Sequence, residues 1–522
     1  MLAPCFGRLF KMSTQTYLID TNVIIGLEDN RMVQPAFAAL LSTAAKHKVD
    51  VIVHEAARED IGRDKDTERR KISLSKLAKF QVLKKVRGLD QSDLERKFGP
   101  LVRVNDVVDA TLLDSIERGA ADFLVTEDRR LHERARRVSP ELGRRVLFAA
   151  DAVQLLKTTF EPVDAPVRYV EEITANEIPL SDRIFDSLRQ GYPGFDTWWR
   201  TKCVKDRRPC WAVFDDGLAG LIVRKDETGA KTDATVKANK ILKICTFKVR
   251  PEKRGIKLGE LLLKKVFWFA HTNKYDLVYL TTYDNQVAFI DLLEFYRFTN
   301  TATKPDGELI YEKRLSRDAL VPVRGTSNFE VNRLNYPRFI TQSSIMAFCV
   351  PIKEAYHDIL YPDLKSQDEP DLFDSFGMTG GPKRPGNTIR KVYLCRAPSN
   401  LGPAGSLLLF YKGKSKRGPS QAITSLGIFE ECSIAKSTKD LMLLTGGRSV
   451  YSEPQLNGWE ATATRPVKVI NYLLAAYIEP SISLEELREI GAIKGHPPQS
   501  IFEVSRAHLE TLLPRMNLGF SA

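Results

Sequence analysis

The stretch Val249-Arg-Pro-Glu-Lys-Arg-Gly-Ile-Lys-Leu-Gly-Glu-Leu-Leu-Leu263 joins an apolar strand end to a basic, glycine-containing loop and then to an amphipathic helix. We predict a buried strand over 242–249, a loop over 254–259 and a helix over 261–269. The first amides of a helix have no partner within the helix, and the helix dipole places positive charge at that end. Because an anionic phosphate is attracted to such a position, the stretch predicts a pyrophosphate site in an α/β fold.

The loop also carries a family pattern. Residues 254–259 match Arg/Gln-x-x-Gly-x-Gly/Ala, and the segment thereby resembles the acetyl-CoA loop of the GNAT acetyltransferases. Lys257 stands where this consensus prefers glycine, so it leaves less room for close backbone approach but offers a charge. The resemblance implies acetyl-CoA as the cofactor, and it implies cofactor contacts from Phe247, Val249, Arg254, Gly255, Ile256, Lys257, Leu258, Gly259 and Asn285.

Size and composition limit the class of protein. A chain of 522 residues exceeds what one core organises, and at about 150 residues per domain we predict three units. The net charge of +12 fits a nucleic-acid partner, although a solvated basic surface would also explain it. Seven cysteines without a Cys-x-x-Cys pair favour reduced thiols in a cytoplasm, and the histidines lack the spacing of a zinc site. No apolar run is long enough to span a membrane, the first eleven residues are too short for a secretory signal, and Met12 is an alternative start.

The first predicted unit, residues 14–160, places acids at the ends of apolar strands. Thr16 to Ile19 is followed by Asp20, a second strand covers 49–54, and the strand within 122–125 is followed by Asp128. A carboxylate at the carboxyl end of a parallel strand points into the crevice where α/β sheets bind ligands. The unit resembles the PIN nuclease domain through its strand-Asp-Thr-Asn opening and its Leu-Val-Thr-x-Asp ending.

The PIN resemblance implies a metal site. Its four ligands would be Asp20, Asp60, Asp109 and Asp128, with Asp20 and Asp109 also catalytic, and the metal Mg²⁺ or Mn²⁺. Clustered carboxylates repel one another and are stabilised when a divalent cation lies among them, where it can activate water against a phosphodiester. Two positions stay open, because Glu55 and Glu59 compete with Asp60, and Asp106 and Asp114 compete with Asp109. The alternative for each acid is a helix cap or a surface carboxylate without function.

A basic stretch follows the second strand. Residues 65–87 hold nine basic side chains against two acidic ones. We predict an amphipathic helix that turns a basic face toward RNA phosphates, or toward solvent alone, and that turns these apolar side chains inward: Ile72, Leu74, Leu77, Phe80 and Leu83.

The middle unit, residues 165–320, contains the opening stretch. Strands over 210–214 and 219–224 flank Asp215-Asp-Gly217, a pattern that predicts a hairpin turn. The segment from Leu292 to Phe298 resembles the Phe-Tyr-x-x-x-Gly-Phe ending of the acetyltransferases, although Arg297-Phe298-Thr299 replaces the spaced Gly-Phe. This resemblance implies Tyr296 as the general acid that returns a proton to the CoA thiolate, whereas the alternative is an aromatic residue packed in the core.

The last unit, residues 340–522, shows short strands separated by glycine turns. We predict strands over 343–351, 391–396 and 422–429, and a glycine turn followed by a long strand within 401–411. This order resembles the PUA, ASCH and EVE group and implies a small RNA-associated β-barrel. Residues 383–417 hold nine basic side chains and no acidic one, interleaved with Tyr393, Phe410 and Tyr411. Cations and aromatics together suit single-stranded nucleic acid, unless the aromatics belong to the core.

These patterns predict a multidomain α/β and α+β protein with a PIN-like parallel α/β sheet, a GNAT-like mixed sheet and a PUA-like small β-barrel. The predicted activities are acetyl transfer from acetyl-CoA to an amine and metal-dependent RNA cleavage, with RNA as partner. A rival from another class is a regulatory nucleic-acid-binding protein in which one catalytic unit is silent and acts as a sensor. A homo-oligomer is compatible with the composition, and the acceptor is not specified.

Overall fold

The computed structural model describes residues 15–26, 35–63, 66–86, 90–160, 169–253, 257–364, 388–415, 419–445 and 453–520. The chain divides into two compact units: unit 1 comprises residues 1–161 and 442–446, and unit 2 comprises residues 162–441 and 447–522. Each unit is described by itself below. The described residues contain no helix that is long and apolar enough to cross a membrane.

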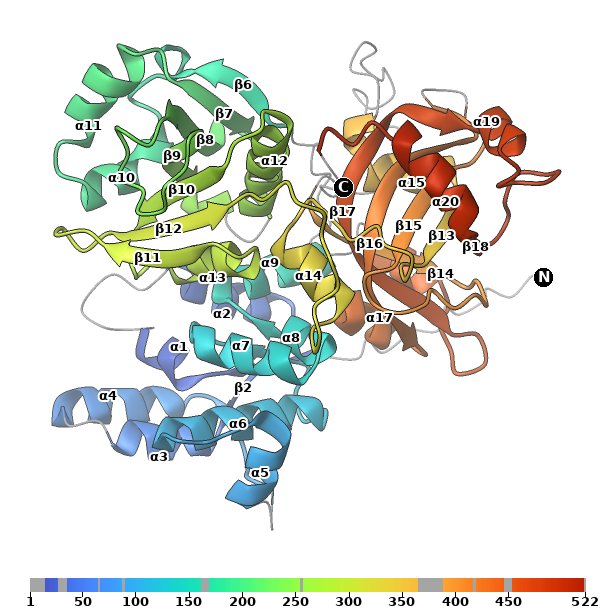
Figure 1. Ribbon diagram of the computed structural model, residues 1–522. Helices are drawn as coiled ribbons and strands as arrows, with labels where there is room; N and C mark the ends of the chain where they lie inside the picture. The colour runs from blue at the N-terminus through green and yellow to red at the C-terminus, as the bar shows by residue number, and fades with distance from the viewer. Residues whose placement is uncertain are drawn as a thin grey trace, which may run out of the picture. The chain divides into compact units, whose positions relative to one another are not determined.

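Unit 1 is built on a parallel sheet of five strands in the order β3-β2-β1-β4-β5. Figure 1 labels β2 of this sheet and the helices of the unit. Tyr17 and Ile19 of the first strand belong to one core cluster, and Leu18 belongs to another. Both faces of the sheet are therefore covered, which is why its strands are continuously apolar. The strands are β1 Thr16–Ile19, β2 Asp50–His54, β3 Gln81–Leu83, β4 Phe123–Val125 and β5 Val146–Leu147.

The helices of unit 1 connect these strands. They are α1 Thr21–Gly26, α2 Pro35–Lys46, α3 Ala56–Gly62, α4 Thr67–Leu77, α5 Gln91–Phe98, α6 Val104–Glu117, α7 Arg129–Val138, α8 Pro140–Arg145 and α9 Ala149–Phe160.

The prediction of one amphipathic helix through 65–87 is wrong. Helix α4 ends at Leu77, and the following residues enter the sheet as β3, paired with β2. Leu77 is buried, but Ile72 is 49% exposed and Leu74 is 36% exposed. Helix α4 therefore packs through a narrower face than its apolar residues suggest. The second half of residues 65–87 pairs with β2 as a strand instead of continuing the helix.

The first sheet of unit 2 has seven strands in the order β11-β12-β10-β9-β8-β7-β6. β9 and β10 are parallel, and all other neighbours are antiparallel. The strands are β6 Glu171–Thr174, β7 Pro209–Phe214, β8 Leu218–Glu227, β9 Ile241–Val249, β10 Leu277–Thr282, β11 Thr299–Thr303 and β12 Leu309–Arg314.

Helices cover both faces of this sheet. α12 Leu258–Thr272 and α13 Val287–Phe295 share one core cluster, whereas side chains around α10 Asp186–Gly191 and α11 Phe195–Trp198 form another cluster with β7 and β8. The predicted hairpin turn is confirmed, since Asp216 and Gly217 join β7 to β8 with positive φ values of 52° and 86°.

The second sheet of unit 2, which we call the C-terminal sheet, has the order β14-β17-β16-β15-β13-β18. Among the described strands no pairing joins β14 to β18, so the predicted barrel closure is not confirmed. The strands are β13 Ala347–Ile352, β14 Arg390–Cys395, β15 Leu407–Lys412, β16 Ala422–Ala435, β17 Val467–Ser483 and β18 Phe502–Val504. The flanking helices include α14 Asn328–Leu334, α15 Glu354–Leu360, α18 Glu453–Gly458, α19 Leu484–Glu489 and α20 Arg506–Leu512. Helix α17 Thr438–Thr445 begins in unit 2, and its residues from 442 on belong to unit 1.

The predicted basic surface over 383–417 is partly wrong. Lys391 and Lys412 are each 3% exposed: the Lys391 Nζ donates to the Leu360 carbonyl, and Lys412 forms an ion pair with Asp358 at 3.0 Å. Of the three aromatics of this segment, Phe410 and Tyr411 are core residues, and Tyr393 is half-buried with its hydroxyl donating to the Pro351 carbonyl at 3.0 Å. Of the basic residues in the described part of this segment, Arg396 and Lys414 are exposed, and residues 383–387, 416 and 417 lie outside the described residues.

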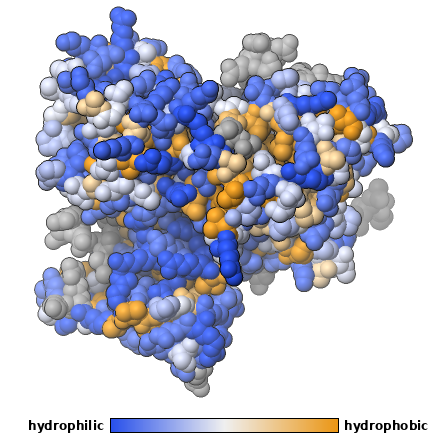
Figure 2. All heavy atoms as spheres, viewed as in Figure 1, coloured by the Kyte–Doolittle hydropathy of each residue, from blue (hydrophilic) through white to orange (hydrophobic). Residues whose placement is uncertain are grey.

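One core cluster contains residues of both sheets of unit 2, among them Leu262 of α12 and Leu409 of β15. Apolar side chains are therefore gathered inside the unit, and Figure 2 shows mostly hydrophilic residues on the visible face. The two sheets of unit 2 thus share one interior, and α12 belongs to it.

Candidate functional sites

The parallel strands β9 and β10 separate before they end. Their pairing runs from Ile241–Leu277 to Ile244–Leu280, after which β9 continues to Val249 paired with β8 alone. A shift in register between β8 and β9 leaves Cys245 as an extra residue at the point where the strands part. Such a bulge bends its strand. In the described ladder, residues 245–249 therefore have a strand neighbour on one side only, a geometry that suits an extended ligand that carries amide groups.

Helix α12 begins at the same end of β9. Lys257 precedes its first turn with φ +60°, a conformation that glycine adopts without strain and other residues rarely do. This explains physically why a glycine is preferred at this position of the loop. Residues 254–256, which include Arg254, Gly255 and Ile256, lie outside the described residues.

The structure brings the other predicted cofactor residues to one edge of the sheet. Phe247 and Val249 lie at the carboxyl end of β9, and Leu258 and Gly259 open α12. A Cβ added at Gly259 would meet Leu292 at 3.5 Å and Phe247 at 4.0 Å, which is ordinary contact. Asn285 is exposed in the segment after β10, whose carboxyl end lies at the same edge because β9 and β10 are parallel.

The β7–β8 turn contacts the residues that follow β9 and begin the loop before α12. Arg250 is 3% exposed, and its guanidinium donates to the carbonyls of Asp216 at 2.8 Å and Asp215 at 3.2 Å. Lys253 forms an ion pair with the Asp215 carboxylate at 2.9 Å. Sequence reasoning identified the turn but not these contacts, since nothing in the local pattern shows that the turn and the loop meet.

Tyr296 lies at the end of α13 and is 0% exposed. Its ring packs against Phe267, with ring centroids 5.5 Å apart, and against Tyr336 at 5.6 Å. The next residue, Arg297, has φ +66°, as a glycine in the predicted ending would. If Arg297 takes that glycine position, the tyrosine of the pattern falls four residues earlier, on Leu293, which is also buried. These contacts favour the packing alternative for Tyr296, and its general-acid role stays a prediction.

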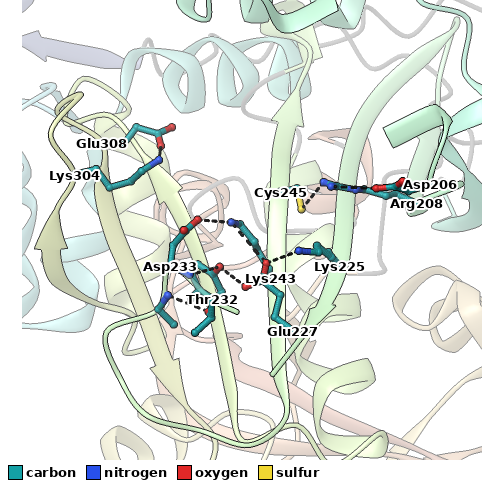
Figure 3. A network of polar contacts seen from close by, with 12 residues as sticks. Asp206, Arg208, Lys225, Glu227, Thr232, Asp233, Lys243, Cys245, Lys304 and Glu308 are labelled. Carbon is teal, nitrogen blue, oxygen red and sulfur yellow. Dashed lines mark hydrogen bonds and ion pairs between the residues drawn. The ribbon is translucent and has the colours of Figure 1, made fainter. Parts of the chain in front are cut away.

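The sheet face opposite α12 carries charged groups that the sequence did not single out (Figure 3). Lys243 of β9 contacts Asp233 at 2.5 Å, and Glu227 accepts from the Tyr279 hydroxyl at 2.6 Å. Burial lowers the pKa of Lys243, but Asp233, Tyr279 and Glu227 outweigh it and leave that pKa raised. Lys243 therefore stays positively charged beside the acidic side chains of Asp233 and Glu227.

A second group lies beyond the end of β10. The rings of Tyr192 and Tyr283 are 5.4 Å apart. The Glu308 carboxylate forms an ion pair with Lys304 at 2.7 Å (Figure 3). Burial and the neighbouring Glu308 raise the pKa of Tyr192, so this phenol stays protonated at neutral pH. Two aromatic rings beside a carboxylate are suited to binding an alkylammonium group.

In unit 1, Asp20 is buried at the end of β1. Its carboxylate accepts from the Thr126 hydroxyl at 2.7 Å and from the Thr21 amide at 2.6 Å. Burial raises its pKa to about 6, with smaller contributions from Asp128 and Asp60 and against the lowering effect of these hydrogen bonds. Burial, with Asp20 and Asp128, raises the pKa of Asp109 to about 8. The structure thus brings Asp20, Asp109 and Asp128 within electrostatic reach of one another, with Asp60 near Asp20.

The competing acids have other partners. Glu59 pairs with Lys85, Asp106 with Arg103 at 3.1 Å, and Asp114 with Lys97 at 2.9 Å. Glu55 accepts from the Lys85 amide. Among the acids predicted first, Asp60 pairs with Arg63 at 2.8 Å, and Asp128 caps α7 by accepting from the Arg130 amide at 2.8 Å. Asp109 is therefore favoured over Asp106 and Asp114.

The carboxylate oxygens of these acids are suitable ligands for a hard divalent cation, but the acids do not lie close enough together to form a complete metal site. Within the described ranges, no group of three or more His, Cys, Asp or Glu side chains lies close enough to hold a metal ion. The structure also adds residues that the sequence did not single out. Thr126 donates to Asp20, and Asn22 donates to the Thr126 hydroxyl at 3.1 Å. The Thr-x-Asp and Asp-Thr-Asn patterns contained both residues.

Comparison with known proteins gives no family. No family model matches the sequence, and no curated protein matches it. Among solved structures, a variant of the ASCH protein of Zymomonas mobilis is 15% identical, with 33% of this chain and 99% of that chain covered and a TM-score of 0.24. The PaiA N-acetyltransferase of Thermoplasma acidophilum, in complex with coenzyme A, is 14% identical, with 28% and 99% covered and a TM-score of 0.23. A candidate GNAT-family acetyltransferase of Desulfovibrio desulfuricans is 18% identical, with 28% and 99% covered and a TM-score of 0.22. At these TM-scores the likeness carries no argument, so the functional conclusion rests on the geometry above.

Proposed function

We propose that the first sheet of unit 2 forms an N-acetyltransferase that moves the acetyl group of acetyl-CoA to an amine. The observation that carries this proposal is the separation of β9 from β10 directly beside the first turn of α12. A strand with a neighbour on one side only suits the amide groups of the pantetheine arm, and helix amides suit the pyrophosphate. Acetyl-CoA would supply the activated thioester, and residues 245–249 and 257–259 would hold it.

The side chains beyond the end of β10 support an amine acceptor. A bound alkylammonium group would take the place of Lys304 at Glu308 and lie against the rings of Tyr192 and Tyr283. It must lose a proton before its nitrogen attacks a carbonyl carbon. The departing thiolate must gain a proton. We propose ordered water as its source, because the packing of Tyr296 in the core disfavours the general-acid role that the sequence predicts for it. We propose an RNA-bound protein or RNA itself as the carrier of the amine.

Calorimetry of the full chain with coenzyme A tests the cofactor proposal. We expect saturable binding, and we expect acetylation of polyamine or lysine-peptide probes to fall by at least tenfold in Glu308→Gln, within the range for loss of a charge-assisted contact. Glu510→Gln serves as control, because Glu510 pairs with Arg506 on its own helix. If the wild-type chain does not bind coenzyme A, the acetyltransferase proposal is wrong.

Unit 1 supports a second proposed function, the metal-dependent cleavage of RNA. The supporting observation is that, beside burial, the Asp128 charge raises the pKa of Asp20, and the Asp20 and Asp128 charges raise the pKa of Asp109. Asp20, Asp60, Asp109 and Asp128 would hold Mg²⁺ or Mn²⁺, which would supply an activated water. The described acids form no three-ligand group in this structure. Cleavage of single-stranded RNA with Mn²⁺ should disappear in Asp20→Asn, and equal cleavage by both proteins would refute the nuclease.

RNA binding is proposed mainly through unit 1. Lys71, Lys79, Lys84 and Lys85 are exposed there, whereas part of the basic segment of the C-terminal sheet is buried. The rival proposal is a regulatory protein with one silent catalytic unit, for example an acetyl-CoA sensor anchored on RNA. Coenzyme A binding without turnover on any amine probe would favour that rival.

A further inference from the structure

Helix α12 is held from two sides within unit 2. Gly259 faces Leu292 and Phe247, which belong to the first sheet and its helix α13. Glu260 and Lys264 are four residues apart and therefore share a face of the helix. Glu260 contacts β14 of the C-terminal sheet, and Lys264 contacts the segment between β13 and β14. The helix therefore packs against both sheets of unit 2.

The first of these contacts joins Glu260 to Arg390, the first residue of β14. Glu260 is 3% exposed, and its carboxylate accepts from the Arg390 Nε at 2.9 Å, from the Arg390 backbone amide and from the guanidinium Nη2 at 2.8 Å. Burial raises the pKa of Glu260, but Arg390 and Lys257 outweigh it and hold that pKa below its usual range. A bidentate arginine fixes a carboxylate in direction as well as position.

The second contact lies one turn further along α12. The Lys264 ammonium forms an ion pair with Asp363 at 2.7 Å, and the Tyr477 hydroxyl of β17 donates to the same carboxylate at 2.9 Å. Lys264 lies 5.0 Å from the Trp268 ring centroid, and the Trp268 and Tyr477 rings meet edge to face at 5.3 Å. These groups prevent the helix from sliding or rotating against the C-terminal sheet.

We propose that Arg390 and Asp363 are positioning residues for acetyl-CoA, so that the C-terminal sheet is part of the acetyltransferase. This inference rests on the proposed function. Glu260 belongs to the first turn of α12, whose amides would meet the pyrophosphate. Removing Arg390 leaves a buried carboxylate without its cation, and the first turn must move to hydrate it. Displaced amides bind phosphate less well, whereas the amine side of the site keeps its geometry.

The expected signature is a change in cofactor binding without a change in chemistry. Arg390→Gln should raise the Kd for coenzyme A and the KM for acetyl-CoA about tenfold, the factor that corresponds to about 1.4 kcal/mol. The kcat at saturating acetyl-CoA and the KM for the amine should change by less than twofold. Arg390→Lys should recover part of the affinity, since it restores the charge but not the two-pronged contact. Asp363→Asn should shift affinity in the same direction as Arg390→Gln.

The measurements are calorimetry with coenzyme A and steady-state kinetics with acetyl-CoA, on the full chain, with thermal unfolding as a check of folding. Arg506→Gln is the control, because it removes an arginine that contacts Glu510 of α20 and the Gln342 carbonyl rather than α12. Folded Arg390→Gln and Asp363→Asn proteins with a Kd within twofold of wild type would overturn the inference, as would a fall in kcat at unchanged KM.

If Arg390→Gln does not fold, Arg390→Lys and Asp363→Asn decide by the same criterion. Failure of all three to fold, with Arg506→Gln intact, would assign the contacts to stability alone and also overturn it. A wild-type chain that binds no coenzyme A refutes the proposed function instead.

Discussion

At the residue scale, Lys257 is the departure from the acetyl-CoA loop pattern that the structure explains best. Its φ of +60° is costly for a side chain with a Cβ, by about 1–2 kcal/mol. We therefore expect Lys257→Gly to raise the free energy of unfolding of unit 2 by about 1 kcal/mol, measured by urea denaturation. Lys257→Ala is the control, since it removes the charged chain but keeps the Cβ. An equal gain in both variants would contradict the backbone explanation.

Tyr296 presents the opposite case, a residue with a predicted chemical role in a packed environment. Because its ring lies in the core at 0% exposure, we expect Tyr296→Phe to keep kcat within about twofold at neutral pH, well short of the 10²–10⁴-fold that a general acid contributes. The measurement is kcat with saturating acetyl-CoA. A loss of a hundredfold or more, with coenzyme A affinity unchanged, would restore the general-acid role and refute the packing alternative.

At the element scale, α4 shows where periodicity misleads. Its apolar residues have helical spacing, but only Leu77 of the three within the helix is buried. Leu77→Ala should therefore lower the free energy of unfolding of unit 1 by about 2–5 kcal/mol through the cavity it creates. Ile72→Ala, at 49% exposure, should change it by at most about 0.5 kcal/mol. Similar losses in denaturant titrations of the two variants would show that the helix packs through its other face.

Other elements followed from the sequence because their determinants are local. The Asp-Gly turn between β7 and β8 requires positive φ values, and the strand-end acids of unit 1 follow from short apolar runs. Contacts across long sequence separations have no such signature. The ion pair of Glu260 with Arg390 joins positions 130 residues apart, and the burial of Lys391 depends on Leu360 as its partner. Local charge counting therefore assigned Lys391 to a surface that it does not occupy.

At the scale of the whole molecule, the proposed functions divide between two units that are each compact. The acids of the proposed nuclease belong to unit 1. Helix α12 and the two ion pairs that hold it, Glu260 with Arg390 and Lys264 with Asp363, belong to unit 2. Sequence reasoning found the acids and the loop as separate patterns. It did not show that α12 is shared between two sheets, because the strands on its two sides come from segments far apart in the chain.

This division predicts two independent thermal transitions in the full chain. Coenzyme A at a hundredfold excess over its Kd should stabilise the unit that binds it by about 2.7 kcal/mol and leave the other unit unchanged. Leu77→Ala should lower the remaining transition alone, so that the ligand and the substitution move different peaks in scanning calorimetry. Asp20→Asn should abolish RNA cleavage without altering the coenzyme A shift. If coenzyme A raised the temperatures of both transitions together, the two units would unfold as one cooperative body. That result would contradict the proposal that the two activities belong to independent units.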